Sequence, residues 1–243
     1  MPAAATITTT ATMTTTITPE KPTPETPLAP PALLRLIAWL SPAFPTGAFA
    51  YSHGLEWAIE SHDITNETTL ADWLHDLLTY GTARTDTILL RHAHKSASNP
   101  AALKQIATLA SATAAAKERQ AESIDQGKAF MLAAAPWGIP PAPDSIPYPV
   151  AVGAVAGAHR IPENPTATAY LQAFTTNLIS AAVRLVPLGQ TAGLRTLAAL
   201  EPTILQTAEE TTNATLDDLG GCTFRSDLAA MRHETQYTRL FRS

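Results

Sequence analysis

Apolar side chains recur at intervals of three and four residues along most of the chain, which is the spacing of a helix buried on one face. The clearest example lies between Pro165 and Pro187. Its apolar positions on one face are Leu171, Phe174, Leu178, Ala182 and Leu185. Because proline suits a first turn and breaks a helix interior, the two prolines predict the limits of this helix.

The same period predicts further helices. The segment "TTLADWLHDLLTYG" ends at Gly81, a candidate C-terminal cap. The alanine-rich stretch 99–135 favours two helices that meet near 111–115. No segment shows sustained strand alternation. The sequence therefore predicts an all-α fold, a single-domain helical bundle of about ten helices.

Two proline-rich segments set the domain organisation. Residues 1–31 repeat threonine and proline, a composition that favours a flexible arm over a packed element. The globular domain is then expected at 32–243. A second proline cluster at 136–149 separates helices of one composition, so we interpret it as a long loop within one domain.

Charge and cysteine content exclude several classes of protein. The net charge of −5, with only 16 Lys and Arg, argues against nucleic acid as a partner. The single Cys222 cannot form an internal disulfide or a CxxC metal site, which fits a cytoplasmic protein. No secretory signal or bilayer-spanning segment is apparent, so we expect a soluble protein with no membrane association.

The segment "SPAFPTGAFAYSHGLEWAIE" is the least helical of the apolar regions. Its prolines and Gly47 oppose regular structure, and Phe44, Phe49 and Tyr51 lie among them. A rigid loop that presents aromatic side chains could bind a partner. The alternative is a packed loop whose rings cover the core.

In the same segment, His53 and Glu56 stand three residues apart, which on a helix places both on one face. Two interpretations are open. They could be metal ligands or an acid/base pair, or they could be a surface histidine and a solvated or capping glutamate. No third ligand is near in sequence, which favours the second.

Other polar groups favour structural roles. We expect His92 and His94 at the surface, pointing to different sides of a helix. The run that contains Glu122, Asp125 and Lys128 predicts a solvated helical face. Arg184 and Gln190 flank the break near Pro187 and are expected to bond the free backbone groups there.

The signatures of the common catalytic folds are absent. No GxxxxGK[ST], GxSxG, HExxH or GxGxxG pattern occurs. With one cysteine and scattered histidines, the sequence favours a binding or scaffolding protein without catalytic residues, cofactor or metal.

The last residues, "HETQYTRLFRS", are unusually apolar and arginine-rich for a chain terminus. Tyr237, Leu240 and Phe241 expose too much apolar surface to remain uncovered at roughly 25 cal/mol per Å². Arg239 can make forked hydrogen bonds at an interface. Either a partner covers this tail, or the tail docks on its own helices.

Three segments together resemble the urease accessory protein UreF family. They are "LSPAFPTGAFAYSHGLEWAIE", "AAVRLVPLGQTAG" and "MRHETQYTRLFRS", in the order and spacing of that family. The resemblance covers the chain from about Leu33 onward and leaves the arm outside it. Family members often carry a proline before the final helix, where this chain has Arg225 or Ser226. The start of the last helix is therefore open.

The resemblance implies an all-α, dimeric, non-enzymatic chaperone. Such proteins join UreD (also called UreH) and the GTPase UreG in a complex that loads nickel into apo-urease, and they recruit and gate UreG. The tail, 231–243, is then expected to order on a UreD-like partner. Arg239 and the loop with Phe49 and Tyr51 are expected to receive the GTPase.

The candidate partner-binding residues lie in the tail and in the segment that begins with the loop of Phe44, Phe49 and Tyr51, which we call the aromatic loop. They are Phe49, Tyr51, His53, Glu56, His233, Glu234, Gln236, Tyr237, Arg239, Leu240 and Phe241. Two alternatives remain open. One is a helical enzyme or metal-binding protein that uses His53 and Glu56, with His233 as an additional candidate. The other is a stand-alone dimeric module whose tail closes its own dimer.

Overall fold

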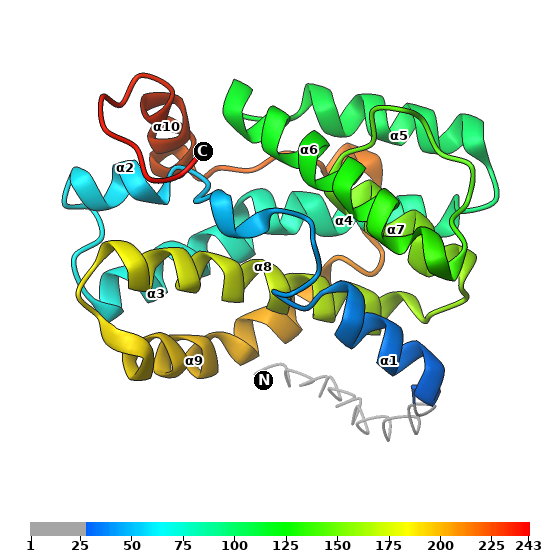
Figure 1. Ribbon diagram of the computed structural model, residues 1–243, viewed down its shortest axis with the longest axis horizontal. Coiled ribbons are helices and arrows are strands. Elements are labelled where there is room, and N and C mark those ends of the chain that lie inside the picture. Colours follow the sequence, from blue (N-terminus) through cyan, green and yellow to red (C-terminus); the bar gives the residue numbers. More distant parts are fainter. Residues whose placement is uncertain (1–27) are drawn as a thin grey trace, which may run out of the picture.

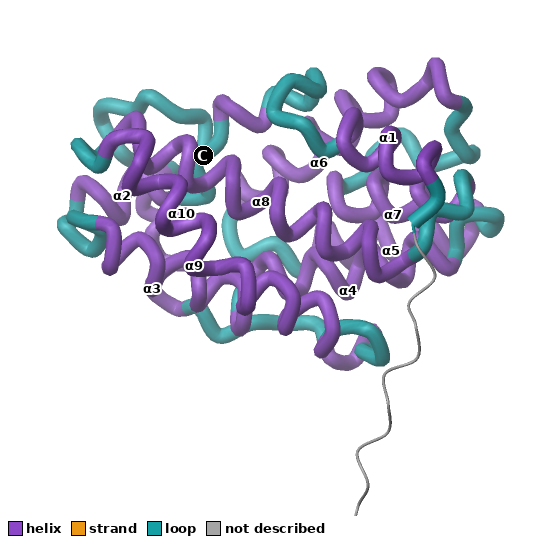
Figure 2. Tube along the Cα trace, turned by 90° about the horizontal axis from the view of Figure 1, so that it is seen from below, coloured by secondary structure: helices purple, strands orange, loops and turns teal. Residues whose placement is uncertain are grey.

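Ten α-helices and three short 3₁₀ helices form the part of the chain that this computed structural model describes, residues 28–243 (Figure 1). The α-helices are α1 Pro30–Trp39, α2 Leu55–Glu60, α3 Glu67–Tyr80, α4 Thr82–Lys95, α5 Pro100–Ala112, α6 Lys117–Ala134, α7 Tyr148–Ala158, α8 Glu163–Leu185, α9 Gly189–Glu210 and α10 Phe224–His233. No strand occurs in this range, and the perpendicular view shows helices and loops alone (Figure 2). The predicted all-α bundle is confirmed.

The expected N-terminal arm lies almost wholly outside the described residues. Where the description begins, α1 starts at Pro30, inside the range 1–31 that the composition assigned to the arm. Proline at the first helical position explains this start, because its fixed φ is that of a helix and its missing N–H is not needed there.

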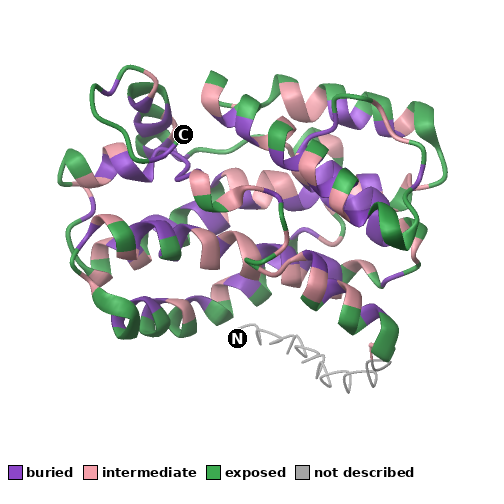
Figure 3. Cartoon of the chain, in the orientation of Figure 1, coloured by how far each residue is buried: buried purple, intermediate pink, exposed green. Residues whose placement is uncertain are grey.

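α8 joins two hydrophobic clusters into one bundle. One cluster gathers side chains of α1, α4, α5, α6 and α7, and Tyr170 of α8 belongs to it. The other gathers side chains of α2, α3, α8 and α9, including Leu171 and Leu178. Neighbouring residues of one helix therefore enter both clusters. Figure 3 shows buried residues along the facing sides of the helices and exposed residues along their outer sides.

Most predicted helix limits hold because local chemistry sets them. α8 ends at Leu185, before Pro187, as predicted, but it begins at Glu163, so Pro165 lies within its first turn instead of before it. The alanine-rich stretch divides between Ala112 and Lys117. Gly81 is the C-cap of α3, as predicted, but its conformation is extended instead of left-handed. A Cβ there would lie 2.8 Å from the Thr223 side chain, so close packing explains the glycine.

The apolar segment "PVAVGAVAGA" lies in α7, which is buried and packs closely on α4. A Cβ at Gly153 would lie only 2.1 Å from the Leu90 carbonyl oxygen, so this approach requires glycine. The proline-rich loop runs from 138 to 147 and leads into α7. No helix within residues 28–243 is both long and apolar enough to cross a membrane.

Candidate functional site

The C-terminal tail, residues 231–243, folds back over α2 and the aromatic loop that precedes it. Thr223 precedes the first residue of α10, which settles where the last helix begins. Beyond α10, the Arg242 N–H donates to the Ala50 carbonyl oxygen at 2.8 Å, and the Ser52 N–H donates to the Ser243 carbonyl oxygen at 2.7 Å. The C-terminus consequently lies beside α2 and α10 (Figures 1 and 2). The two segments that the sequence singled out meet in space.

Glu56 is the buried anchor of this tail. Its carboxylate accepts hydrogen bonds from the Leu240 N–H at 2.7 Å and the Phe241 N–H at 2.9 Å. His233 Nε2 lies 3.2 Å from the same carboxylate. The position of Glu56 near the start of α2 also suits a negative charge. One carboxylate therefore holds two backbone donors of the tail and the last residue of α10.

His233 bridges two carboxylates. Its Nδ1 lies 2.6 Å from Glu118 Oε2, opposite the Nε2 contact with Glu56. A neutral imidazole carries only one N–H, so both contacts are hydrogen bonds only when the ring carries both protons. Arg239 donates to the other oxygen of Glu118 at 2.7 Å. We call Glu56, Glu118, His233 and Arg239 the tail clamp.

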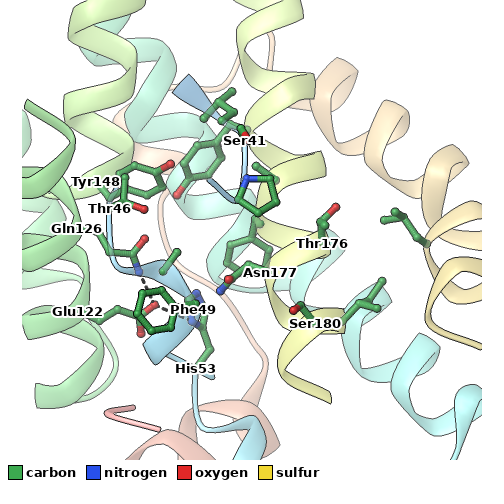
Figure 4. A pocket seen from close by; sticks show the side chains of 18 of the residues that line it. Ser41, Thr46, Phe49, His53, Glu122, Gln126, Tyr148, Thr176, Asn177 and Ser180 are labelled. Carbon is green, nitrogen blue, oxygen red and sulfur yellow. Dashed lines mark hydrogen bonds and ion pairs between the residues drawn. The ribbon is translucent and has the colours of Figure 1, made fainter. Parts of the chain in front are cut away.

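A second buried cluster lies beside the clamp. His53 Nδ1 is 2.8 Å from Glu122 Oε1 (Figure 4). Arg119 forms an ion pair with Glu122. Ser243 Oγ and Gln126 Nε2 also donate to Glu122, at 2.6 and 2.9 Å. Burial alone would raise the pKa of Glu122, but Arg119, His53 and Ser243 outweigh it and hold this pKa at about 2. Burial and then the charge of Arg119 lower the pKa of His53.

The expected exposure of several polar residues was wrong. His53 and Glu56 are both buried, so neither is a surface group. His53 precedes α2 with a φ of 59° and faces Glu122, whereas Glu56 faces the tail. Within residues 28–243 no three His, Cys, Asp or Glu side chains are arranged to hold a metal ion. Glu122, expected on a solvated face, is also buried.

Three further polar residues differ in part from expectation. His92 and His94 do point to different sides, but they are half-buried, with Nε2 atoms 3.1 and 2.7 Å from the carbonyl oxygens of Ala214 and Ile161. Arg184 donates to the Phe49 carbonyl oxygen at 2.7 Å instead of to the break at Pro187.

The apolar residues of the loop and the tail divide between inside and outside. Phe241 is 5% exposed and packs beneath the Arg184 guanidinium, so the protein itself covers it. Tyr51 is also buried, and its hydroxyl donates to Asp125 at 3.2 Å. In contrast, Tyr237 and Leu240 are 102% and 76% exposed, and Phe49 is 69% exposed. The tail docks on its own helices and still presents apolar side chains to solvent.

Glu234 and Gln236 hold the tail in place. Glu234 accepts a hydrogen bond from the Lys117 N–H at 2.9 Å, at the start of α6. Gln236 Nε2 donates to Glu60 at 2.5 Å. These two residues contact their own chain, and the outward-facing candidates are Phe49, Tyr237, Arg239 and Leu240.

An apolar stripe on α10 was not among the predicted candidates. Phe224, Leu228 and Met231 are exposed large apolar residues. Their spacing of four and three places them on one face of the helix, so the helical period alone could have identified them. We call these three residues, together with the exposed Tyr237 and Leu240 of the tail, the α10–tail surface.

Comparisons with known proteins agree on one family. The UreF family model matches residues 64–201. The chain is 49% identical over 227 residues to the urease accessory protein UreF of Bradyrhizobium sp. strain BTAi1, covering 90% of this chain and 95% of that protein. It is 50% identical over 228 residues to the UreF of Xanthobacter autotrophicus, covering 88% and 93%. Against the UreF of Rhodopseudomonas palustris strain BisA53 it is 50% identical over 222 residues, covering 87% and 93%.

Proposed function

The chain belongs to the UreF family of urease accessory proteins, and from this premise we propose that it is the scaffold that bridges a UreD(UreH)-like protein and a UreG-like GTPase. Membership in this family makes it an accessory protein in urease maturation and not an enzyme. In the proposed complex it recruits and gates the GTPase while nickel is inserted into the apo-urease subunits.

The observation that carries this proposal is an apolar surface on a rigidly held tail. Tyr237 and Leu240 face solvent, while Glu56 and His233 fix the backbone beside them from within. A surface that is already ordered loses less conformational entropy on binding, so more of its contact energy becomes affinity. Exposed aromatic and aliphatic side chains are also the usual anchors of protein interfaces.

We assign the two partners to two adjacent regions. The UreD-like protein binds the α10–tail surface, whose apolar side chains need a large apolar counterpart. The GTPase binds Arg239 and the exposed Phe49 of the aromatic loop. The tail forms hydrogen bonds with this loop at Ala50 and Ser52. These bonds support the proposal that binding of the UreD-like protein alters the site of the GTPase.

We further propose that the protein works as a homodimer in the cytoplasm. Leu33, Leu34 and Ile37 leave an exposed apolar face on α1, away from the tail (Figure 1). A second copy could cover this face, which would leave the α10–tail surface free for the UreD-like protein.

Arg239→Ala should abolish recruitment of the GTPase and leave the fold intact. The Arg239 side chain is partly exposed, and an exposed ion pair contributes about 1 kcal/mol or less to stability. Size-exclusion chromatography of the chain with the UreD-like protein and the GTPase would show a binary complex in place of a ternary one. Arg195→Ala is the matched control, because Arg195 forms an exposed ion pair with Glu67 on α3. Ternary assembly that is unchanged by Arg239→Ala would exclude the assigned role.

A further inference from the structure

A cavity of about 310 Å³ opens between the aromatic loop and helices α4, α6, α7, α8 and α9. Figure 4 shows Phe49, His53, Glu122, Tyr148 and Asn177 around it. No residue of the tail lines it, so it is separate from the α10–tail surface.

The cavity has an apolar mouth and a polar inner end. Phe49 and Leu194, which are both exposed, lie on its outer side together with Val183 and Leu197. The buried lining side chains are mostly polar or aromatic, among them His53, Arg119, Glu122 and Tyr170, with Ile179 as an apolar exception. A ligand that fits this division has an apolar stem and a polar head.

Asp86, on α4, is the carboxylate of the cavity that forms no ion pair among the described residues. Its carboxylate accepts one hydrogen bond, from the Tyr170 hydroxyl at 2.9 Å. Among the described residues no Lys, Arg or His forms an ion pair with Asp86. Glu122, in contrast, is already paired with Arg119 and bonded to Ser243 and Gln126.

The charges around Asp86 leave the inner end negative. Arg119 and Glu122, both from α6, pair with each other and so add no net charge, although Arg119 lowers the pKa of Asp86 more than Glu122 raises it. The lowered pKa of His53 keeps its ring neutral near pH 7. The hydroxyls of Tyr148 on α7 and Tyr170 on α8 stay neutral because burial raises their pKa values. Asp227 on α10, which lines a neighbouring cavity together with Asp86, adds a further carboxyl, and burial raises its pKa. Burial raises the pKa of Asp86 to about 6, so most Asp86 carboxyls are still charged at pH 7.

We propose that this cavity binds an alkylammonium group, with the ammonium at Asp86 and the methylene stem along Phe49, Val183 and Leu197. Aromatic rings on the walls add cation–π attraction to the carboxylate's charge. The Tyr148 hydroxyl, which makes no hydrogen bond in the structure of residues 28–243, is a further acceptor on the wall. The ammonium belongs either to a lysine side chain of a bound protein or to a free amine.

Two other ligand classes fit less well. An anion would meet net negative charge, because the one guanidinium in the cavity is paired with Glu122. A divalent metal would need several ligating side chains, and the described residues provide no group of three. A single positive charge on an apolar stem matches both ends of the cavity.

Isothermal titration calorimetry of the full chain with n-butylammonium tests this proposal, with n-butanol as the neutral analogue. We expect saturable binding of the ammonium, at least about tenfold weaker binding of the alcohol, and a comparable loss in Asp86→Asn. Asparagine keeps an acceptor for the Tyr170 hydroxyl, and Asp76→Asn on the exposed face of α3 is the matched control. Binding should also weaken one pH unit below the pKa of Asp86, because protonation removes the charge.

A short lysine-containing peptide distinguishes the two sources of the ammonium. Tighter binding of the peptide than of n-butylammonium would identify a lysine of a bound protein. Binding of n-butylammonium alone would identify a free amine, and either result supports the site. Equal binding of n-butanol and n-butylammonium, or no binding of any probe to the wild-type chain, would overturn the proposal without depending on how Asp86→Asn folds.

Discussion

Glu56→Ala should release the C-terminal tail and lower the free energy of unfolding by about 3 kcal/mol, because it leaves buried donors without an acceptor. The lost acceptor serves the N–H groups of Leu240 and Phe241 and Nε2 of His233. Since no other carboxylate bonds these two N–H groups in the described structure, the tail has no equivalent position to adopt.

Two measurements separate tail release from general destabilisation. Urea unfolding gives the change in stability, and limited proteolysis reports whether the peptide bonds near Arg239 become accessible under native conditions. Glu201→Ala is the matched control, because Glu201 is exposed on α9. If the variant's tail were cut no faster than that of the wild type, Glu56 would not be the anchor of the tail.

Replacing both Tyr237 and Leu240 with alanine should weaken binding of the UreD-like protein and leave the stability of the fold unchanged. This is the reverse of the effect expected for Glu56→Ala, which lowers stability. Both side chains are almost fully exposed, so their removal should change the free energy of unfolding by no more than about 0.5 kcal/mol. If they anchor the UreD-like protein, their loss should weaken binding by at least about 2 kcal/mol, roughly thirtyfold in Kd. Calorimetric or biolayer titration against the UreD-like protein measures this change.

The matched control carries the same two substitutions elsewhere. Tyr80 and Leu132 are also exposed, on α3 and α6, and their replacement by alanine should leave the affinity unchanged. An affinity of the Tyr237/Leu240 variant equal to that of the wild type would remove the tail from the interface. An equal loss in both variants would point to a nonspecific effect of lost apolar surface.

The helices could be predicted because their signals are local. The spacing of apolar residues identifies α8, and the helix ends at Leu185, two residues before Pro187. The break between α5 and α6 similarly follows from composition, and Asn99 with Pro100 marks the start of α5. These features need only neighbouring residues to be recognised.

The polar clusters could not be predicted, because their partners are distant in sequence. Glu56 bonds Leu240 and Phe241, and His53 meets Glu122. When the partner of a glutamate is distant in sequence, the glutamate is predicted to be exposed to solvent, because an unpaired buried charge is strongly disfavoured. Only the fold shows that the partner exists.

The tail shows a third case, in which the sequence indicated the right segment but not its orientation. Tyr237, Leu240 and Phe241 look equivalent in "YTRLF", and each could face a partner. The hydrogen bonds of Glu56 to adjacent N–H groups fix the backbone so that Phe241 turns inward, while Leu240 turns outward. Tail packing and partner binding therefore use different residues of one segment.

The proposal that this chain bridges two partners is tested most directly by co-elution of the UreD-like protein and the UreG-like GTPase with and without it. On size-exclusion chromatography with GTP and nickel present, we expect the GTPase to elute with the UreD-like protein only when this chain is included. Co-elution of those two proteins to the same extent in its absence would contradict the bridging role.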